Sequence, residues 1–407
     1  MSIAEREQSE LAFGLVAAEP EATFGHHALP RGAILTMAHG AGGFAELESG
    51  WRQLQTRSPD PALFQGFDWL NTWVAVYGRA PDDPQPLVIA GHLDGELVFA
   101  WALMRQRIGP LTVLRWMSEP LAQYGDILVA PGQCPKAWLS AALDRIRVLR
   151  DVDIIRLRHV RDDANAAPFL RQHFRNSLLT ELAPWLDLSA FANEAAYDAR
   201  YTANQRKRRK KIRKALEDAF GPITFDLLEP GAEMDNAIAA AVVEKCQWLD
   251  QRGRQNRALC DRQIVEFLRR LSGAGGDARL VVSRMCAGPR PVSWEIGLRK
   301  GGTHFGFITS HVTALTDYSP ARLHMDLSQR RALNDGLKAF DLMVPNDAHK
   351  ESWSSAKTET SDYHLPLSPL GRLYGAGYLE TARPLLRRAY YRMPPHLLRL
   401  LKPVVGH

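Results

Sequence analysis

Residues 304–353, HFGFITSHVTALTDYSPARLHMDLSQRRALNDGLKAFDLMVPNDAHKESW, decide the fold of this chain. A strand pattern opens the stretch, and an irregular loop follows over 313–320. An amphipathic helix is predicted over 321–336, then a strand over 337–344 and a polar loop with Lys350. A helix that begins after a loop leaves its first backbone N–H groups unpaired, and its dipole adds positive charge there. We therefore expect a phosphorylated cofactor at the start of this helix.

The size and composition of the chain are those of a folded protein with more than one domain. Its 407 residues suit two domains of roughly 150 to 200 residues each. The 45% of hydrophobic and 24% of charged residues are ordinary for a globular protein. The four cysteines form no CxxC pair, so neither a metal site nor a disulfide scaffold is indicated, and a reducing cytoplasm is expected. Without a signal-peptide pattern or an apolar run of about 18 residues, we expect neither export nor a membrane span.

Basic residues are concentrated in two segments of the chain. The formal charge is +6, and residues 366–407 hold seven basic residues against one acidic residue. Eight of the nine residues 206–214 are also basic, within a helix predicted over 191–220. Because no aromatic residues interrupt this run, we prefer a solvated helix or a surface for an anionic substrate to a nucleic-acid site. We expect the leucine-rich and arginine-rich tail to pack on the protein, with contact to an anionic membrane surface as the alternative.

The two halves of the chain repeat the same order of patterns. A strand hairpin is predicted around Asp94-Gly95 and another around the turn 286–289. A further strand, a helix and a last strand follow each hairpin, and the aspartates Asp153 and Asp341 of the last strands are 188 residues apart. This predicts a duplicated α/β unit, in which a mixed, mainly antiparallel sheet is flanked by helices. The expected domains are a flexible leader (1–30), an N-terminal domain (31–182), a C-terminal domain (183–370) and a basic helical tail (371–407).

The second half resembles a known family. The resemblance lies in the Tyr-Ser-Pro loop at 318–320, the Phe-Asp pair at 340–341, and Lys350 followed by Trp353. These residues resemble the GNAT-fold acyltransferases of the bacterial cellulose-biosynthesis family (CelD-like, with a BioF-like acetyltransferase domain). The tandem arrangement is more remotely similar to Fem-type peptidoglycan aminoacyltransferases, which use aminoacyl-tRNA. The resemblance implies two GNAT-like domains and an acyl-CoA cosubstrate.

The start of the helix at 321 is the predicted place for the cofactor phosphates. Pro320 has no N–H group, so its neighbours are the better donors. Either Arg322 or Arg330 could add positive charge. Ala321 stands where the family has glycine, so either the backbone there needs no positive φ or the loop is reshaped. The alternative is an ordinary helix start capped by a serine. The candidate cofactor-binding residues are Ser319, Ala321, Arg322 and Leu323.

Transfer of an acyl group to an amine requires a proton acceptor and stabilisation of the carbonyl oxygen. Glu295 and His311 are candidate bases on neighbouring strands. Simple alternation puts His311 and His304 on opposite faces, so only one of them can share the cofactor face. Lys350 could stabilise negative charge or bind an acidic group, and Asp341 could orient it. Each side chain could instead be a hydrogen-bonded structural residue.

We predict a cytoplasmic N-acyltransferase that moves an acyl group, with acetyl as first choice, from acyl-CoA to an amine. The acceptor would be a small molecule or an envelope or polysaccharide precursor, and no metal is expected. A Fem-type transferase is one alternative, with the helix at 206–214 as the tRNA contact. A non-catalytic accessory protein of envelope or exopolysaccharide biosynthesis is the other, because a fold does not fix a function.

Overall fold

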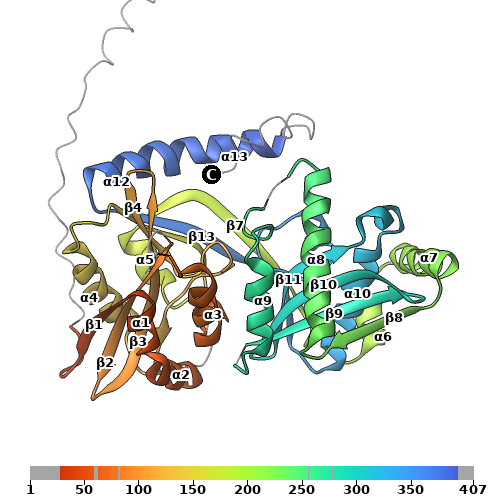
Figure 1. Cartoon of the computed structure of the whole chain (residues 1–407), viewed down its shortest axis with the longest axis horizontal. Helices are drawn as coiled ribbons and strands as arrows, with labels where there is room; N and C mark the ends of the chain where they lie inside the picture. The colour runs from red at the N-terminus through yellow and green to blue at the C-terminus, as the bar shows by residue number, and fades with distance from the viewer. Residues whose placement is uncertain (1–27, 59–62, 81–82, 255, 277, 393–407) are drawn as a thin grey trace, which may run out of the picture.

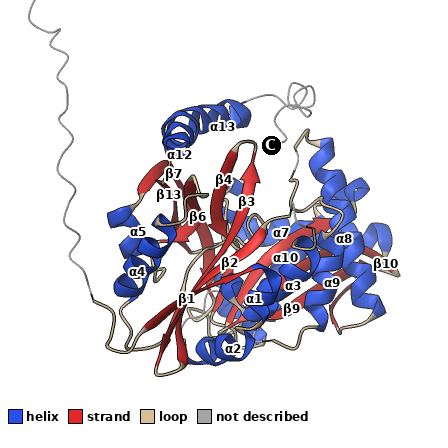
Figure 2. Cartoon of the chain, turned by 60° about the vertical axis from the view of Figure 1, so that its left-hand side comes forward, coloured by secondary structure: helices blue, strands red, loops and turns tan. Residues whose placement is uncertain are grey.

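The computed structural model describes residues 28–58, 63–80, 83–254, 256–276 and 278–392. Most of the predicted leader and the end of the predicted tail therefore lie outside the described residues. Two lobes stand side by side, and long strands run from one lobe into the other (Figure 1). The strands form the interior of both lobes, and the helices lie outside them (Figure 2).

The first half begins with a short strand and four helical segments, of which α1 and α2 pack on the hairpin that follows. Trp69 and Trp73 recur on one face of α3 and are buried, as their spacing predicts. The elements are β1 (Ile34–His39), α1 (Gly40–Ala45), α2 (Glu48–Arg57), η2 (Leu63–Gln65), α3 (Phe67–Tyr77), β2 (Gln85–Leu93), β3 (Glu96–Ile108), β4 (Leu111–Trp116), β5 (Leu128–Val129), α4 (Pro135–Arg147), β6 (Ile154–Arg161), α5 (Ala167–His173) and β7 (Arg175–Asp187).

The second half repeats this order after two connecting helices and ends in a long surface helix. Its elements are α6 (Glu194–Ala199), α7 (Ala203–Phe220), β8 (Ile223–Leu228), α8 (Ala232–Gln251), α9 (Ile264–Gly273), β9 (Arg279–Ala287), β10 (Arg290–Lys300), β11 (Thr303–His311), η3 (Thr313–Tyr318), α10 (Pro320–Asn334), β12 (Ala339–Asp341), α11 (Ala348–Glu351), β13 (Ala356–Pro366), α12 (Pro369–Leu373), the π-helical η4 (Tyr374–Ala382) and α13 (Arg383–Arg392).

The strands of both halves join in one 13-stranded sheet. The order is β1-β2-β3-β4-β6-β13-β7-β12-β11-β10-β9-β8, with β5 beside β3. Read from its outer edge inwards, each half has the same arrangement, β1-β2-β3-β4-β6 in one and β8-β9-β10-β11-β12 in the other. In both, the last of these contacts is parallel, between β4 and β6 and between β11 and β12. The predicted duplication of a mixed, mainly antiparallel unit is confirmed.

The two halves exchange their last strands at the centre of the sheet. β7 comes from the first half but pairs with β12, and β13 comes from the second half but pairs with β6. β7 and β13 also pair with each other, from Ala356 opposite Trp185 to His364 opposite Arg175. The boundary at 182 falls inside β7, so the domain division remains a prediction.

Both exchanged strands, and β8, were missed by the sequence analysis. β7 contains Pro184, which argues against a central strand. β13 is largely polar and lacks apolar alternation. Its buried polar groups find partners after folding: the Thr360 hydroxyl donates to the Glu181 carbonyl at 3.0 Å, and Asp362 accepts from Arg383 at 2.9 Å. Tertiary hydrogen bonds thus replace the apolar pattern that local prediction requires.

The single helix predicted over 191–220 is wrong, because the chain turns between α6 and α7. Thr202 starts α7 with a capping box. Its hydroxyl accepts from the Gln205 backbone N–H at 3.2 Å, and the Gln205 side-chain amide oxygen accepts from the Thr202 backbone N–H at 2.9 Å. This break lets α6 pack against α10 while α7 runs along the surface.

One pair of cysteines corrects the expectation of no disulfide. Cys246, near the end of α8, is bonded to Cys260, and their Cα atoms are 5.8 Å apart. The chain folds back on α8 after Gln251, which brings together two residues 14 positions apart. Spacing alone carried no sign of this contact.

The lobes share core contacts besides the exchanged strands. Trp69 of α3 meets Phe267 of α9 and Phe307 of β11 edge to face, with ring centroids 4.8 and 5.8 Å apart. Helix α3 of the first half therefore packs against one face of β11 in the second half. Within the described chain, no helix combines the length and apolar character that crossing a membrane requires.

Candidate active site

A gap opens where β11 and β12 diverge. The two strands pair only from Thr303 opposite Ala339 to Phe305 opposite Asp341, whereas β11 continues to His311. The chain after β12 stays with β7. In the described chain, the second part of β11 therefore has no strand partner on the β12 side. The Thr309 carbonyl in this part of β11 accepts from Lys245, and the rest of the backbone edge is available to an extended ligand.

An extra residue in β11 changes which side chains reach this gap. In the pairing with β10, Gly306 and Ile308 face consecutive residues, so Phe307 is the extra residue of a β-bulge. The bulge shifts the alternation by one residue. By this register His304 and His311 lie on the same face of the sheet, and the prediction of opposite faces is wrong.

Asp341 lies at the closed end of the gap and joins the two halves. Tyr124 of the first half donates its hydroxyl to Asp341 Oδ1 at 2.8 Å, and the Met343 N–H donates to the same oxygen at 2.7 Å. Arg161 of β6 donates to Oδ2 at 3.2 Å. Burial raises the pKa of Asp341. These three donors fix Asp341 in place, and Asp341 in turn fixes Tyr124 and the end of β12.

Two lysines contact the chain segments that diverge at the gap. Lys350 Nζ donates to the Met343 carbonyl at 2.9 Å, and Lys245 Nζ of α8 donates to the Thr309 carbonyl of β11 at 3.1 Å. Burial and the nearby charge of Lys245 lower the pKa of Lys350 to about 8, although Asp347 opposes them. Burial also lowers the pKa of Lys245. Lys350 therefore changes charge within the range of ordinary assays.

Glu295 and His304 form a buried pair between β10 and β11. His304 Nε2 lies 2.6 Å from Glu295 Oε1, and the Glu295 side chain is 1% exposed. Burial favours the neutral acid, but the hydrogen bond and charge of His304 outweigh it and lower the pKa of Glu295. A base must reach the proton that it removes. The geometry therefore gives Glu295 a core contact and leaves His311 as the accessible candidate.

His311 ends β11 in a defined orientation. Its Nε2 lies 3.1 Å from the Thr316 hydroxyl, which itself donates to the Thr313 carbonyl at 2.7 Å. The hydroxyl hydrogen is thus committed, so Nε2 must carry the imidazole proton and Nδ1 keeps its lone pair. Burial, with Lys245 and Arg252 nearby, lowers the pKa of His311. His311 is neutral at pH 7 and can accept a proton at Nδ1.

Only some of the backbone N–H groups predicted to bind phosphates at the start of α10 are free of the local hydrogen bonds around Ser319. Ser319 has a left-handed backbone with φ 54° and makes no side-chain cap. Its N–H donates to the Thr316 carbonyl, and the Arg322 N–H donates to the Ser319 carbonyl, both at 3.0 Å. Ala321 lies within the helix and needs no positive φ. Of the predicted donors, Ala321 and Leu323 keep N–H groups outside these contacts.

The side chain of Arg322 contributes to a cleft between α7 and α10. Burial and the charges of Arg208 and Arg209 lower the pKa of Arg322, so three guanidinium groups converge there. The cleft has a volume of about 120 Å³. Its lining residues are Tyr201, Gln205, Arg208, Arg209, Ile212, Arg322, Leu323, Asp326, Ser352 and Trp353.

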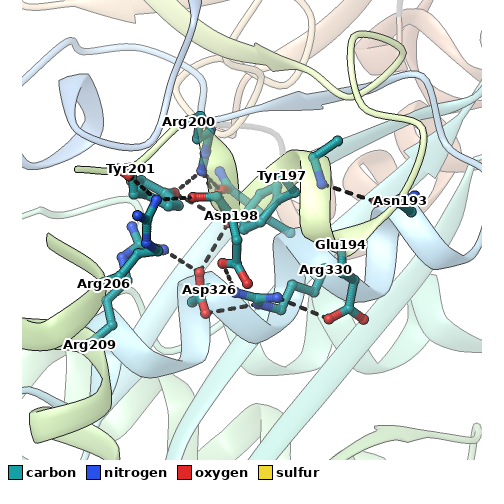
Figure 3. A network of polar contacts seen from close by, with 12 residues as sticks. Asn193, Glu194, Tyr197, Asp198, Arg200, Tyr201, Arg206, Arg209, Asp326 and Arg330 are labelled. Atoms are coloured by element: carbon teal, nitrogen blue, oxygen red, sulfur yellow. Dashed lines mark hydrogen bonds and ion pairs between the residues drawn. The ribbon is translucent and has the colours of Figure 1, made fainter. Parts of the chain in front are cut away.

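Aromatic and acidic residues hold Arg209 in the cleft. Its guanidinium lies 3.4 Å from the ring centroid of Tyr201 and 4.3 Å from that of Trp353, and it forms an ion pair with Asp326. Figure 3 shows Asp326 shared between Arg209 and Arg330. Arg330 also binds the acidic residues of α6, so it is committed to holding α6 on α10 rather than to a ligand.

The corresponding gap in the first half is filled by its own chain. The segment after β4 turns back along β6, where the Gly125 N–H donates to the His159 carbonyl at 3.3 Å. Gly125 is pressed against Trp116, and a Cβ there would lie 2.0 Å from Trp116 Nε1. This segment carries Tyr124 to Asp341. The open gap between β11 and β12 therefore has a filled counterpart between β4 and β6.

The part of the chain that contains the open gap matches a known protein family. Residues 203–351 match the family model of the acetyltransferase (GNAT) domain. The matched region includes α7, β11, α10 and Lys350, and the predicted GNAT-like fold is confirmed. No curated protein matches the chain.

Solved structures of similar fold span most of the chain. A conserved protein of unknown function from Bacteroides thetaiotaomicron has a TM-score of 0.50 and 11% identity, and covers 79% of this chain and 97% of its own. The C-terminal domain of a putative lysylphosphatidylglycerol synthetase from Agrobacterium fabrum has a TM-score of 0.51 and 9% identity, over 82% and 95%. A tandem GNAT protein from the clavulanic acid biosynthesis pathway has a TM-score of 0.45 and 12% identity, over 83% and 99%.

The matched region brings together only part of the predicted site. Lys350 and Asp341 lie at the gap, His311 lies at its rim, and Arg322 and Leu323 line the cleft. Glu295 is buried against His304, with its carboxylate beside Gly306 where β11 and β12 diverge. Sequence reasoning gave no role to Tyr124, Arg161, Lys245, Tyr201 and Arg209. The Tyr-Gly-Asp triplet at 124–126 and the basic run were visible signals, but nothing local told which residues they would face.

Proposed function

We propose that this protein is an N-acyltransferase that moves an acyl group from acyl-CoA to an amine. The observation that carries the proposal is the unpaired edge of β11, which runs from Asp341 and Lys350 towards the start of α10. Acyl-CoA has phosphates at one end and the acyl group at the other. It therefore matches a site that is cationic at one end and enclosed at the other.

The residues of this chain suit acyl-CoA. The guanidinium groups of Arg208 and Arg322 and the first N–H groups of α10 would hold its phosphates, since charge-assisted and helix-terminal donors favour phosphate. The backbone edge of β11 after Phe305 would hold the extended pantetheine arm. When bound, acyl-CoA supplies an acyl group activated as a thioester.

Two side chains have the chemistry that transfer requires. The Lys350 ammonium hydrogen-bonds and stabilises the negative charge that develops on the acyl carbonyl oxygen. Neutral His311 accepts the proton from the attacking amine at Nδ1. Asp341 is a positioning residue: it binds the Met343 N–H, and the Met343 carbonyl in turn orients Lys350.

The acceptor is an amine of a small molecule or of an envelope or polysaccharide precursor. Membership of the CelD-like cellulose-biosynthesis family would favour the polysaccharide precursor, on the motif residues 318–320, 340–341 and Lys350. A non-catalytic accessory role is the outcome to expect if acyl-CoA does not bind.

A second candidate function is transfer of an aminoacyl group from tRNA. It is favoured by α7, which exposes Lys207, Lys210 and Lys211 beside the cleft. A run of exposed cations binds phosphate backbones. One structure of similar fold is a domain of a putative lysylphosphatidylglycerol synthetase, which suits the same reaction class.

Titration calorimetry with acetyl-CoA and a long-chain acyl-CoA separates these candidates. Arg322→Ala together with Arg208→Ala should weaken acyl-CoA binding about 10-fold or more, since each charge-assisted contact contributes roughly 1.5–3 kcal/mol. Lys207→Glu with Lys211→Glu is the matched control and should leave it unchanged. Absence of binding by any acyl-CoA would refute the acyl-CoA proposal. Retention of aminoacyl-tRNA by the wild type, lost in the Lys207→Glu, Lys211→Glu variant, would favour aminoacyl transfer.

A further inference from the structure

The chain ends its described part in a helix that lies across the outside of the molecule. The segments α12, η4 and α13 follow one another without a break from Pro369 to Arg392. The helix lies across the ends of the central strands, near β7 and β13 (Figures 1 and 2).

Polar contacts attach this helix to the body of the protein. Arg383 donates to Asp362 of β13 at 2.9 Å, and Arg387 forms an ion pair with Glu181 of β7. Glu380 lies 3.0 Å from His364 Nε2. Leu379, which is 1% exposed, adds an apolar contact beside Ile154. Most of the charged groups in the middle of the helix thus face the protein.

The outward side of the helix is apolar. Leu373 is 71% exposed, Leu385 58% and Leu386 61%, and Leu370 and Tyr378 are also exposed. Of the nine large hydrophobic side chains exposed in the described chain, five lie on this helix. Isolated exposed leucines are common, but a row of them over an anchored helix marks a surface that binds something.

The charge around the apolar row is positive. Arg372 and Arg388 are exposed beside it. Arg383 and Arg387 are paired with acidic residues of the body, but from residue 388 to the end of the sequence there are four more basic residues and no acidic residue. A second copy of this surface would bring like charges together, which disfavours a face-to-face dimer.

We propose that the outer face of the helix formed by α12, η4 and α13 docks on an anionic membrane surface. Leucine and tyrosine side chains enter the boundary between headgroups and acyl chains, while the arginines contact lipid phosphates. Ion pairs to Asp362 and Glu181 keep the helix on the protein, so the whole molecule is held flat against the lipid.

Sedimentation of the full chain with lipid vesicles tests this docking independently of any transferase activity. Vesicles of neutral phosphatidylcholine are compared with vesicles in which about a third of the lipid is phosphatidylglycerol, at two salt concentrations. The wild type should bind the anionic vesicles, bind the neutral ones weakly, and lose affinity as salt rises. Lack of binding to anionic vesicles at low salt would overturn the proposal.

Two variants and a control assign the binding to the helix. Leu385→Asn with Leu386→Asn removes apolar contact, and Arg372→Gln with Arg388→Gln removes charge; each pair should lower the partition coefficient by about tenfold or more. Val148→Asn changes a valine directly after α4 that is also 71% exposed, and it should bind as the wild type does. Equal binding by the leucine variant and the wild type, with matching thermal unfolding, would contradict the proposal. So would a wild-type dimer that the leucine variant dissociates.

Discussion

Replacement of Lys350 tests the proposed chemistry most directly. With a pKa of about 8, roughly nine in ten Lys350 side chains are charged at pH 7 and one in ten at pH 9. If the ammonium stabilises the developing oxyanion, the wild-type rate must fall about tenfold over this interval, because the charged form is the active one. A lysine that acted as a base would give the opposite sign.

Lys350→Met and Lys350→Arg separate charge from shape. The methionine keeps the apolar stem but no donor, and it should lower kcat by about 10²–10³-fold, the usual loss for one oxyanion contact. Arginine stays charged throughout the assay range, so its rate should be reduced by its different geometry but should show no fall near pH 8. Lys338→Met, on the exposed loop before β12, is the control and should retain wild-type rates.

Release of the CoA thiol from acetyl-CoA, followed with a panel of amines between pH 6 and 9.5, provides the measurement. The ratio of the Lys350→Arg rate to the wild-type rate cancels the titration of the acceptor amine itself. This ratio should rise with pH through about 8. A flat ratio, or a Lys350→Met enzyme within twofold of the wild type, would refute the role assigned to Lys350.

Three further variants test the surroundings of the site. His311→Gln should remove the rise in rate that accompanies imidazole deprotonation below its ordinary pKa of 6.5, and an unchanged acid limb would show that another group is the base. Tyr124→Phe leaves Asp341 with one donor fewer and should cost about 1.5–3 kcal/mol in urea unfolding. Tyr318→Phe, at an exposed hydroxyl, should cost little, and equal losses would contradict the reasoning. Gly125→Ala places a Cβ against Trp116 and should destabilise the protein by roughly 1–3 kcal/mol, whereas Gly377→Ala meets no atom within 4 Å and should be neutral or stabilising.

Local patterns were sufficient for the repeated part of the fold. The hairpins around Asp94-Gly95 and 286–289 and the helix after 320 all follow from turn chemistry and apolar spacing. These elements can be predicted because the turns and apolar faces that determine them lie within a few residues of one another in the sequence. The same locality placed Arg322 at a helix start and Lys350 after a strand, but the predicted polar loop at Lys350 is wrong, because Asp347 caps the short helix α11 there.

The exchanged strands and most site contacts depend on tertiary structure. Tyr124 and Asp341 are 217 residues apart, and no local pattern pairs them. The face of His311 depends on a one-residue bulge at Phe307, which strict alternation cannot anticipate. The polar residues of β13 read as loop until the carbonyls and arginines that satisfy them are in place. Prediction failed where a residue's partner lies in the other half.

The exchange of β7 and β13 explains why the gap between β11 and β12 stays open, whereas the gap between β4 and β6 is filled. β12, the strand that bounds the gap, pairs with β7, and β7 continues into the first half beside β13. The gap can stay open only because the chain after β12 binds β7 instead of β11. Tyr124 and Arg161, both from the first half, then fix Asp341 at the closed end of the gap. The first half therefore keeps β11 and β12 apart, because its strand β7 pairs with β12. β7 is thus as much a part of the site as Lys350 is.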